Sequence, residues 1–123
     1  MTRDEFESFV FENYNASCDR PWARHPGYQV FRHPENGKWF ALAADIPKSA
    51  LNGGSDELVG VVNLKIDPVV SGSFLTEAGI HPAYHMNKDK WITLQLAVVP
   101  DETIKLLLEM SFDATKEKKR ASR

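Results

Sequence analysis

The stretch HPAYHMNKDKW, residues 81–91, concentrates polar and aromatic side chains at the junction between two regular elements. It contains two His, a Tyr, an Asn, two Lys and a Trp. A helix-like segment ends before it at Gly79, and a strand-like segment, residues 91–97, follows it. Because binding residues concentrate in the loops of a rigid scaffold, such a stretch either fixes a corner of the backbone or contacts a partner.

This stretch resembles the YjbR-like family, also called MmcQ, of small bacterial proteins. In that family a Pro-Gly-Tyr-His-Met-Asn-Lys-x-His-Trp run precedes a late strand. Ala83 and Lys90 stand here in place of the usual Gly and His, and the matching residues are Tyr84, His85, Met86, Asn87, Lys88 and Trp91. The resemblance covers roughly residues 20–115. It implies a frataxin-like α+β fold, and it implies DNA binding, which has been proposed for similar proteins through paired wings.

Composition is that of a single globular domain, with 123 residues, 42% of them hydrophobic and 26% charged. No apolar run approaches the ~18 residues that a membrane span needs, and the amino terminus lacks the apolar core of a signal peptide. We therefore expect a cytoplasmic protein without membrane contact, and we favour a monomer. The single Cys18 excludes an internal disulfide and a cysteine-based metal cage.

Charge divides the chain into two parts. Residues 116–123 carry five basic and one acidic side chain, whereas residues 1–115 carry ten basic and sixteen acidic ones. We expect a single α+β domain over residues 1–115 and a frayed basic tail over residues 116–123. The acidic domain weighs against strong non-specific DNA binding, unless its positive side chains share one face.

Hydrophobic periodicity predicts the order helix, hairpin, strand, helix, strand, helix. The predicted ranges are a helix over residues 3–14, strands over 28–32, 38–44 and 58–66, a helix over 67–78, a strand over 91–97 and a helix from residue 100. Most links between strands are too short for parallel crossovers. The sequence therefore predicts a two-layer α+β sandwich, with a mainly antiparallel sheet and helices on one of its faces.

Several local features refine this prediction. Thr2 and Glu5 fit a capping box, and Asp67-Pro68 fits a helix start. Residues 36–37, Asn-Gly, suit the turn of the hairpin. The alternation pattern places one set of side chains in the core (Leu58, Gly60, Val62, Leu64 and Ile66) and the other set, with Asn63 and Lys65, outside. It assigns opposite sides of the sheet to two further sets, Trp39, Ala41 and Ala43 against Phe40 and Leu42.

Motifs for chemistry are lacking in the sequence. His81 and His85 have the spacing of helical metal ligands, but Pro82 opposes a helix there, so we expect no metal. Neither a phosphate-binding glycine loop nor a nucleophile elbow is present. We therefore expect a protein that is not an enzyme and has no cofactor. An enzyme would need a concave pocket in which one of these His residues meets a carboxylate.

The remaining hypothesis is a binding module. Four residues form a donor-rich cluster at a corner of the predicted sheet, and two more flank the predicted hairpin turn: His85, Asn87, Lys88 and Lys90, with Lys38 and Arg32. Lysine and asparagine donors bind phosphate oxygens and base edges, so we expect this set to contact DNA. The hairpin tip would then act as a wing.

Other readings of these residues stay open. His85 and Asn87 fit a role in fixing the corner through hydrogen bonds to the backbone, and the lysines fit simple solvation. Trp22 is expected to plug an edge of the core, and Trp91 is expected to lie within the core. The alternative function is an adaptor for a protein or a small ligand, which uses the sheet face or the loop around Trp22.

Overall fold

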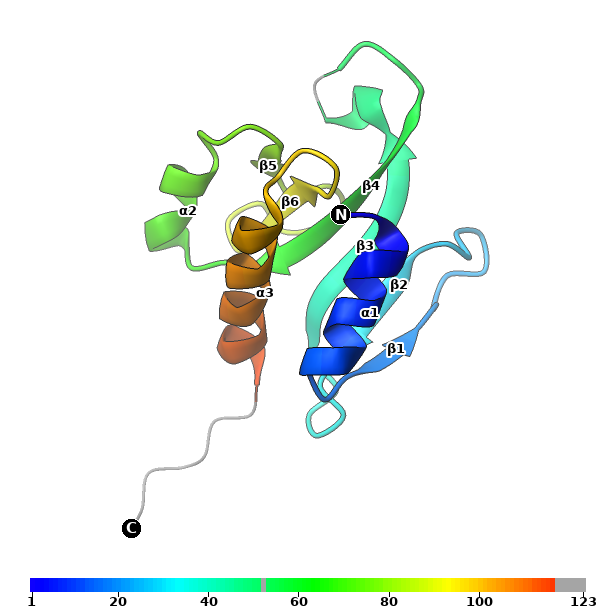
Figure 1. Ribbon diagram of the computed structural model, residues 1–123, viewed down its shortest axis with the longest axis vertical. Helices are drawn as coiled ribbons and strands as arrows, with labels where there is room; N and C mark the ends of the chain where they lie inside the picture. Colours follow the sequence, from blue (N-terminus) through cyan, green and yellow to red (C-terminus); the bar gives the residue numbers. More distant parts are fainter. Residues whose placement is uncertain (52, 117–123) are drawn as a thin grey trace.

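The computed structural model describes residues 1–51 and 53–116 (Figure 1). Its elements, in chain order, are α1 (Arg3–Asn13), β1 (Ser17–Asp19), β2 (Gln29–Arg32), β3 (Trp39–Pro47), the 3-10 turn η1 (Lys48–Ala50), β4 (Leu58–Lys65), α2 (Pro68–Phe74), β5 (Ile80–Pro82), β6 (Trp91–Gln95) and α3 (Asp101–Thr115). Beyond Lys116, the predicted basic tail lies outside the described residues. Among the described residues, no helix is both long and apolar enough to cross a membrane.

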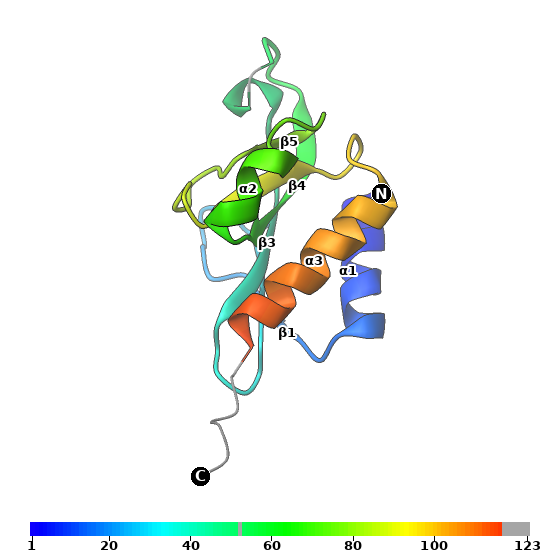
Figure 2. The same ribbon diagram turned by 90° about the vertical axis from the view of Figure 1, so that its left-hand side faces the viewer.

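The six strands form one open sheet in the order β1-β2-β3-β4-β6-β5, and every neighbouring pair is antiparallel. Helices α1 and α3 lie over one face of this sheet, and the turned view shows both on the same side of β3 (Figures 1 and 2). The shorter α2 lies near β5 and adds Val70 and Phe74 to the core under the helices. The predicted two-layer α+β architecture is confirmed.

Both long helices form where local signals predict them. The Thr2–Glu5 capping box is present, and Phe6 and Val10 are buried against the sheet. The sequence predicts an inner stripe of α3 formed by Ile104, Leu107, Leu108, Ser111 and Phe112; the first four are buried and Phe112 is half-buried. Since short isolated helices are marginal in water, these apolar stripes hold the helices on the sheet.

A β-bulge breaks the alternation expected for β3. Phe31 pairs with Ala41, whereas the next residue, Arg32, pairs with Trp39, so that Phe40 is the extra residue. Phe40 and Ala41 both lie in the core under the helices. The prediction that these two neighbours lie on opposite sides of the sheet was therefore wrong.

Two short strands and one buried polar residue also depart from the prediction. The predicted loop over residues 15–27 contains β1, and residues 81–82, predicted as part of a corner, belong to β5. Leu58 is 64% exposed, whereas Asn63, predicted to face outward into solvent, is buried. Gly60 makes room for α1 as expected, because a Cβ there would lie 3.1 Å from Cγ of Arg3.

The face of the sheet away from α1 and α3 carries the candidate site. Phe31 packs edge-on against Phe6 of α1, so its neighbour Val30 points to the opposite face. Leu42 pairs with Val30 and therefore points the same way. We call this side of the sheet the open face.

Candidate functional site

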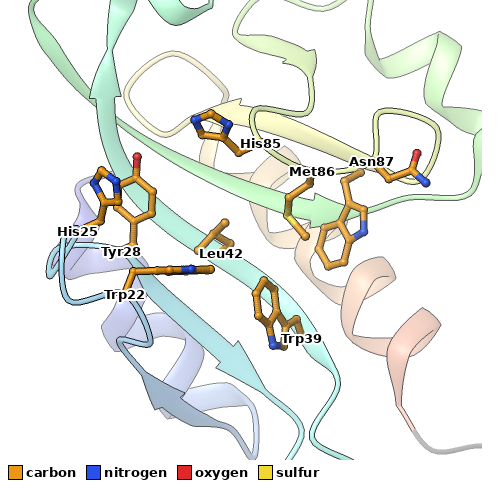
Figure 3. A pocket seen from close by; sticks show the side chains of 9 residues that line it. Trp22, His25, Tyr28, Trp39, Leu42, His85, Met86 and Asn87 are labelled. Atoms are coloured by element: carbon orange, nitrogen blue, oxygen red, sulfur yellow. The ribbon is translucent and has the colours of Figure 1, made fainter.

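A pocket of about 530 Å³ lies on the open face, between the β1–β2 loop and the β5–β6 loop. Leu42 and Trp39 of β3 lie between the two loops, with His25 and Tyr28 on one side and His85 and Met86 on the other (Figure 3). The lining residues are Trp22, His25, Tyr28, Trp39, Leu42, His85, Met86, Asn87 and Trp91. None of them is an acidic residue, a lysine or an arginine.

All three tryptophans of the chain line this pocket. The rings of Trp22 and Trp39 are 5.6 Å apart and nearly perpendicular, at 88°. Tyr28 meets Trp22 edge-on at 6.1 Å, and His25 stacks on Tyr28 at 4.7 Å. Each tryptophan is half-buried, so the expectation that Trp91 lies within the core is corrected, whereas Trp22 packs against Tyr28 and Trp39 at an edge of the sheet face. Their rings form the walls of a cavity.

Buried polar groups of the sheet hold the β5–β6 loop over the open face. The amide of Asn63 donates to the carbonyl of Tyr84 at 2.8 Å, and the Thr93 hydroxyl accepts from the N–H of Tyr84 at 2.9 Å. Thr93 in turn donates to Oδ1 of Asn63. Asn63 therefore faces away from the helices, yet it is buried beneath this loop rather than exposed to solvent.

The two central residues of the loop differ in role. Asn87 Oδ1 accepts from the N–H of Asp89 at 2.8 Å, and the Asn87 carbonyl accepts from Trp91. Its amide points away from the pocket (Figure 3), so the interpretation of Asn87 as a corner-fixing residue is supported. His85 has a left-handed φ of 60° and lines the pocket. Within the described chain its ring makes no hydrogen bond, so that part of the interpretation was wrong.

The β1–β2 loop is anchored by α1. The Arg3 guanidinium donates to the carbonyl of Gly27 and to the Gln29 side chain, both at 2.7 Å, and it pairs with Asp45 at 3.2 Å. Because Arg3 starts α1 and Gly27 directly precedes Tyr28, the helix fixes the position of one pocket wall.

Cations border the pocket without lining it. The Arg32 guanidinium lies 5.3 Å from the centre of the Trp39 ring and pairs with Asp19 at 2.9 Å. Lys65 pairs with Trp91 across the sheet and so lies on the open face. Arg32 is thus stacked on one pocket residue and ion-paired with Asp19, so it supports Trp39 from outside the pocket.

The other predicted site lysines are exposed. Lys38, Lys88 and Lys90 have no ion pair among the described residues. Lys88 lines a neighbouring pocket of about 370 Å³ that shares His85 with the first. The structure thus brings His85, Asn87 and Lys88 together on one loop, with Arg32 across the sheet at Trp39.

Charge is separated between the two faces. Helices α1 and α3 each carry four acidic side chains and one basic one. The segments that border the pocket, residues 19–39 and 83–91, carry six basic and three acidic side chains. The acidic excess of the domain therefore belongs to the helices, on the side of the sheet away from the pocket.

The described residues offer little for catalysis. No group of three or more metal-ligating side chains occurs among them. His81 bonds to the amide oxygen of Gln95 at 2.7 Å rather than to a carboxylate. Burial raises the pKa of the Cys18 thiol, so its reactive thiolate form is disfavoured. Burial also raises the pKa of Tyr28, which keeps its hydroxyl a donor.

The hairpin tip, expected to act as a projecting wing, is fastened to α3. His33 is buried, and its Nε2 lies 2.8 Å from the Thr115 hydroxyl, while the Asn36 amide donates to the Thr115 carbonyl at 3.0 Å. The Thr115 hydroxyl donates to the carbonyl of Ser111, so it accepts from a proton on His33 Nε2. The exposed cation Lys38 is thereby carried on a fixed turn.

We expect His33 to make stability depend on pH. Burial lowers its pKa from 6.5, so the folded protein favours the neutral ring and the unfolded chain binds more protons in acid. The stabilisation is present above about pH 6.5 and is lost as the pH falls through the lowered pKa. Urea unfolding of the parent and of His33→Gln between pH 5 and 8 measures this effect. The stability difference between them should shrink on acidification; a difference independent of pH would contradict it.

The fold and site define a small α+β protein with an acidic helical face and an aromatic pocket on its open face. Residues 12–114 match the YjbR family, and the chain belongs to that family. YyaQ of Bacillus subtilis (strain 168) is 34% identical over 117 residues, which are 94% of this chain and 99% of that protein. The family that residues 81–91 predict is confirmed.

Solved structures share the architecture. A crystal structure of a Pseudomonas syringae protein has a TM-score of 0.91 and 41% identity, and covers 94% of this chain and all (100%) of that one. Deinococcus radiodurans protein DR2400 has a TM-score of 0.67 at 25% identity, covering 90% of this chain and 75% of that one.

Sequence reasoning missed the pocket itself. Trp39, Tyr28, His25, Leu42 and Met86 were assigned to no site. A usable signal was present in β6, where Trp91 occupies the same side as Thr93 and Gln95, opposite to the apolar set. A tryptophan on the polar side of a strand has a large apolar side chain that cannot reach the main core. It therefore indicates a second apolar site on the other face of the sheet.

Proposed function

We propose that this YjbR protein binds nucleic acid without catalysis, and that the open face of its sheet is the contact surface. The separation of charge supports this proposal most directly. Phosphates are attracted to a face that is bordered by cations, and the acidic helices lie on the opposite face of the sheet. The acidic composition of the whole domain is then no obstacle, because six of its ten basic side chains lie in the segments that border the pocket.

The predicted site residues divide between two tasks in this proposal. Lys88, Lys90 and Lys38 are exposed and lack ion pairs in the described chain, so they are available for phosphates. His85 lines the pocket, and in this proposal it contacts a base. Arg32 and Asn87 hold their neighbours in position, through the Trp39 ring and the 87–90 turn respectively.

The double substitution Lys88→Ala with Lys90→Ala should weaken binding at low salt. Two lost phosphate contacts lower the slope of log affinity against log salt by about two units. Anisotropy titrations of labelled DNA at several salt concentrations measure both quantities. The control, Lys48→Ala with Lys105→Ala, removes the same charge from η1 and α3 and should have a much smaller effect. Absence of binding at low salt, or equal effects of the two double variants, would count against the proposal.

A second candidate is an adaptor for a small ligand, favoured by the uncharged aromatic lining of the pocket. In that case neutral aromatic compounds perturb the NMR signals of Trp22, Trp39 and Trp91, and they do so equally in the Lys88/Lys90 variant and in the parent. If perturbation requires a phosphate group, the nucleic-acid proposal is favoured instead.

A further inference from the structure

We infer that the tryptophan pocket takes one unstacked base of a single strand, so that the protein prefers single-stranded nucleic acid to a duplex. This inference rests on the proposed function and specifies its substrate class. The observation behind it is that all three tryptophans of the chain line one concave site, beside Lys88 and Lys90, which make no ion pair within residues 1–51 and 53–116.

The shape of the site selects an unstacked base. The pocket lies between two loops, with Leu42 of β3 between them and the tryptophan rings as its walls. A base within a duplex is paired and stacked, so it reaches such a hollow only by flipping out, at the cost of its pairing and stacking energy. Bases of a single strand are already splayed and stack on aromatic side chains.

The ring geometry suits a flat guest. Trp22 stands at 88° to Trp39 and at 78° to Tyr28, so a base stacked on Trp22 meets the neighbouring rings by their edges. Both stacked and edge-to-face arrangements of aromatic rings are favourable. Arg32 covers Trp39 and is held in place by Asp19, which fixes that wall before any ligand arrives.

Free donors in the pocket complement the acceptors of a base. In the part of the chain that the structure describes, the indole N–H groups of Trp22 and Trp39 and the hydroxyl of Tyr28 make no hydrogen bond. Base edges present ring nitrogens and carbonyl oxygens as acceptors. The lining contains no acidic side chain, so the site offers no carboxylate that would repel a phosphate.

The surrounding charge gives the strand a path past the pocket. Arg32 pairs across the sheet with Trp39, and Lys65 pairs with Trp91, so cations and tryptophans alternate along one end of the open face. Lys88 and Lys90 add positive charge on the loop above. A backbone that follows these cations points a base into the hollow, which is how aromatic platforms and charged grooves combine in single-strand binders.

The test compares a labelled mixed-sequence single strand, the same strand annealed to its complement, and the same strand with its bases replaced by abasic sites. All three carry phosphates, so the bases are the variable. We expect the intact single strand to bind roughly tenfold or more tighter than either of the others. It should also quench the intrinsic tryptophan fluorescence of the parent protein.

The protein variant that accompanies this test is Trp22→Ala, in a surface loop, with Trp22→Phe as the conservative partner. Loss of one stacking ring should weaken single-strand binding roughly tenfold to a hundredfold, and phenylalanine should restore most of it. The control is Phe11→Ala, which removes an aromatic ring that is 46% exposed on α1. Circular dichroism and thermal unfolding establish that each variant folds.

The outcomes separate the two proposals. If duplex and abasic strands bind as tightly as the intact strand, or if Trp22→Ala behaves like Phe11→Ala, the base pocket is refuted while nucleic-acid binding stands. If none of the three nucleic acids binds the parent at low salt, the proposed function is refuted and the base pocket with it.

Discussion

Replacing Gly79 with alanine is expected to destabilise the protein by about 2–5 kcal/mol. Gly79 has a φ of +85°, and an added Cβ would lie 2.8 Å from Cγ1 of Val98 and 2.9 Å from Cγ2 of Val99. The left-handed backbone costs a non-glycine residue about 1–2 kcal/mol, and overpacking adds about 1–3 kcal/mol. The backbone has little freedom to move, because the Gly79 carbonyl accepts from the N–H of Gln95 at 2.8 Å.

The matched control is the same substitution at Gly72 in α2. A Cβ there meets nothing within 4 Å, and alanine is favoured over glycine inside a helix by about 0.5–1 kcal/mol. Urea unfolding should therefore show opposite signs for the two variants. If Gly79→Ala lowers the free energy of unfolding by less than about 0.5 kcal/mol, which is the range of ordinary surface substitutions, then Val98 and Val99 move aside at little cost and the prediction is wrong.

The elements that sequence reasoning predicts well are those with local signals. The capping box at Thr2, the Asp67-Pro68 helix start and the apolar stripe from Ile104 to Leu108 each act within a few turns of chain. Because these signals need no distant partner, they can be recognised without the tertiary structure. The motif from Tyr84 to Trp91 likewise identifies the family directly.

The features that escaped prediction depend on residues far apart in the chain. Strands β1 and β5 have three residues each and exist through pairing with β2 and β6. Asn63 is polar, yet it is buried because the β5–β6 loop returns to cover it through Tyr84. A local alternation pattern shows which side of the sheet a residue faces. It does not show whether a distant loop covers that side, because that is decided by the tertiary structure.

The pocket shows the same limit at the level of function. Trp22, Trp39 and Trp91 come from a loop and two non-adjacent strands, β3 and β6. Of the six predicted site residues, His85 and Asn87 line the pocket, Lys88 lines the neighbouring pocket, and Arg32 stacks on Trp39. Sequence alone thus located residues around the site, and the sheet register brought together the aromatic residues that form it.

Replacing Ser111 with alanine is expected to destabilise the protein by about 2–4 kcal/mol. Its buried hydroxyl donates to the carbonyl of Phe40 at 2.6 Å and accepts from the N–H of Lys65 at 2.9 Å. At the bulge of β3, this side chain thus takes the place of a strand-to-strand bond between β3 and β4. Alanine leaves the buried carbonyl of Phe40 without this partner, at about 1–3 kcal/mol, and the half-buried N–H of Lys65 at a smaller cost. It regains only about 0.5 kcal/mol of helix propensity.

Hydrogen exchange makes this prediction specific. In Ser111→Ala the amide of Lys65 should exchange faster than its neighbours by more than the global loss of stability explains. Ser8→Ala, at an exposed position of α1, is the matched control and should change stability by no more than about 0.5 kcal/mol. If Lys65 keeps its protection in Ser111→Ala, the two strands are joined at the bulge without this hydroxyl. At the bulge, α3 would then contribute apolar packing alone, and its polar contacts with the sheet would be those of Thr115 with the turn at His33 and Asn36.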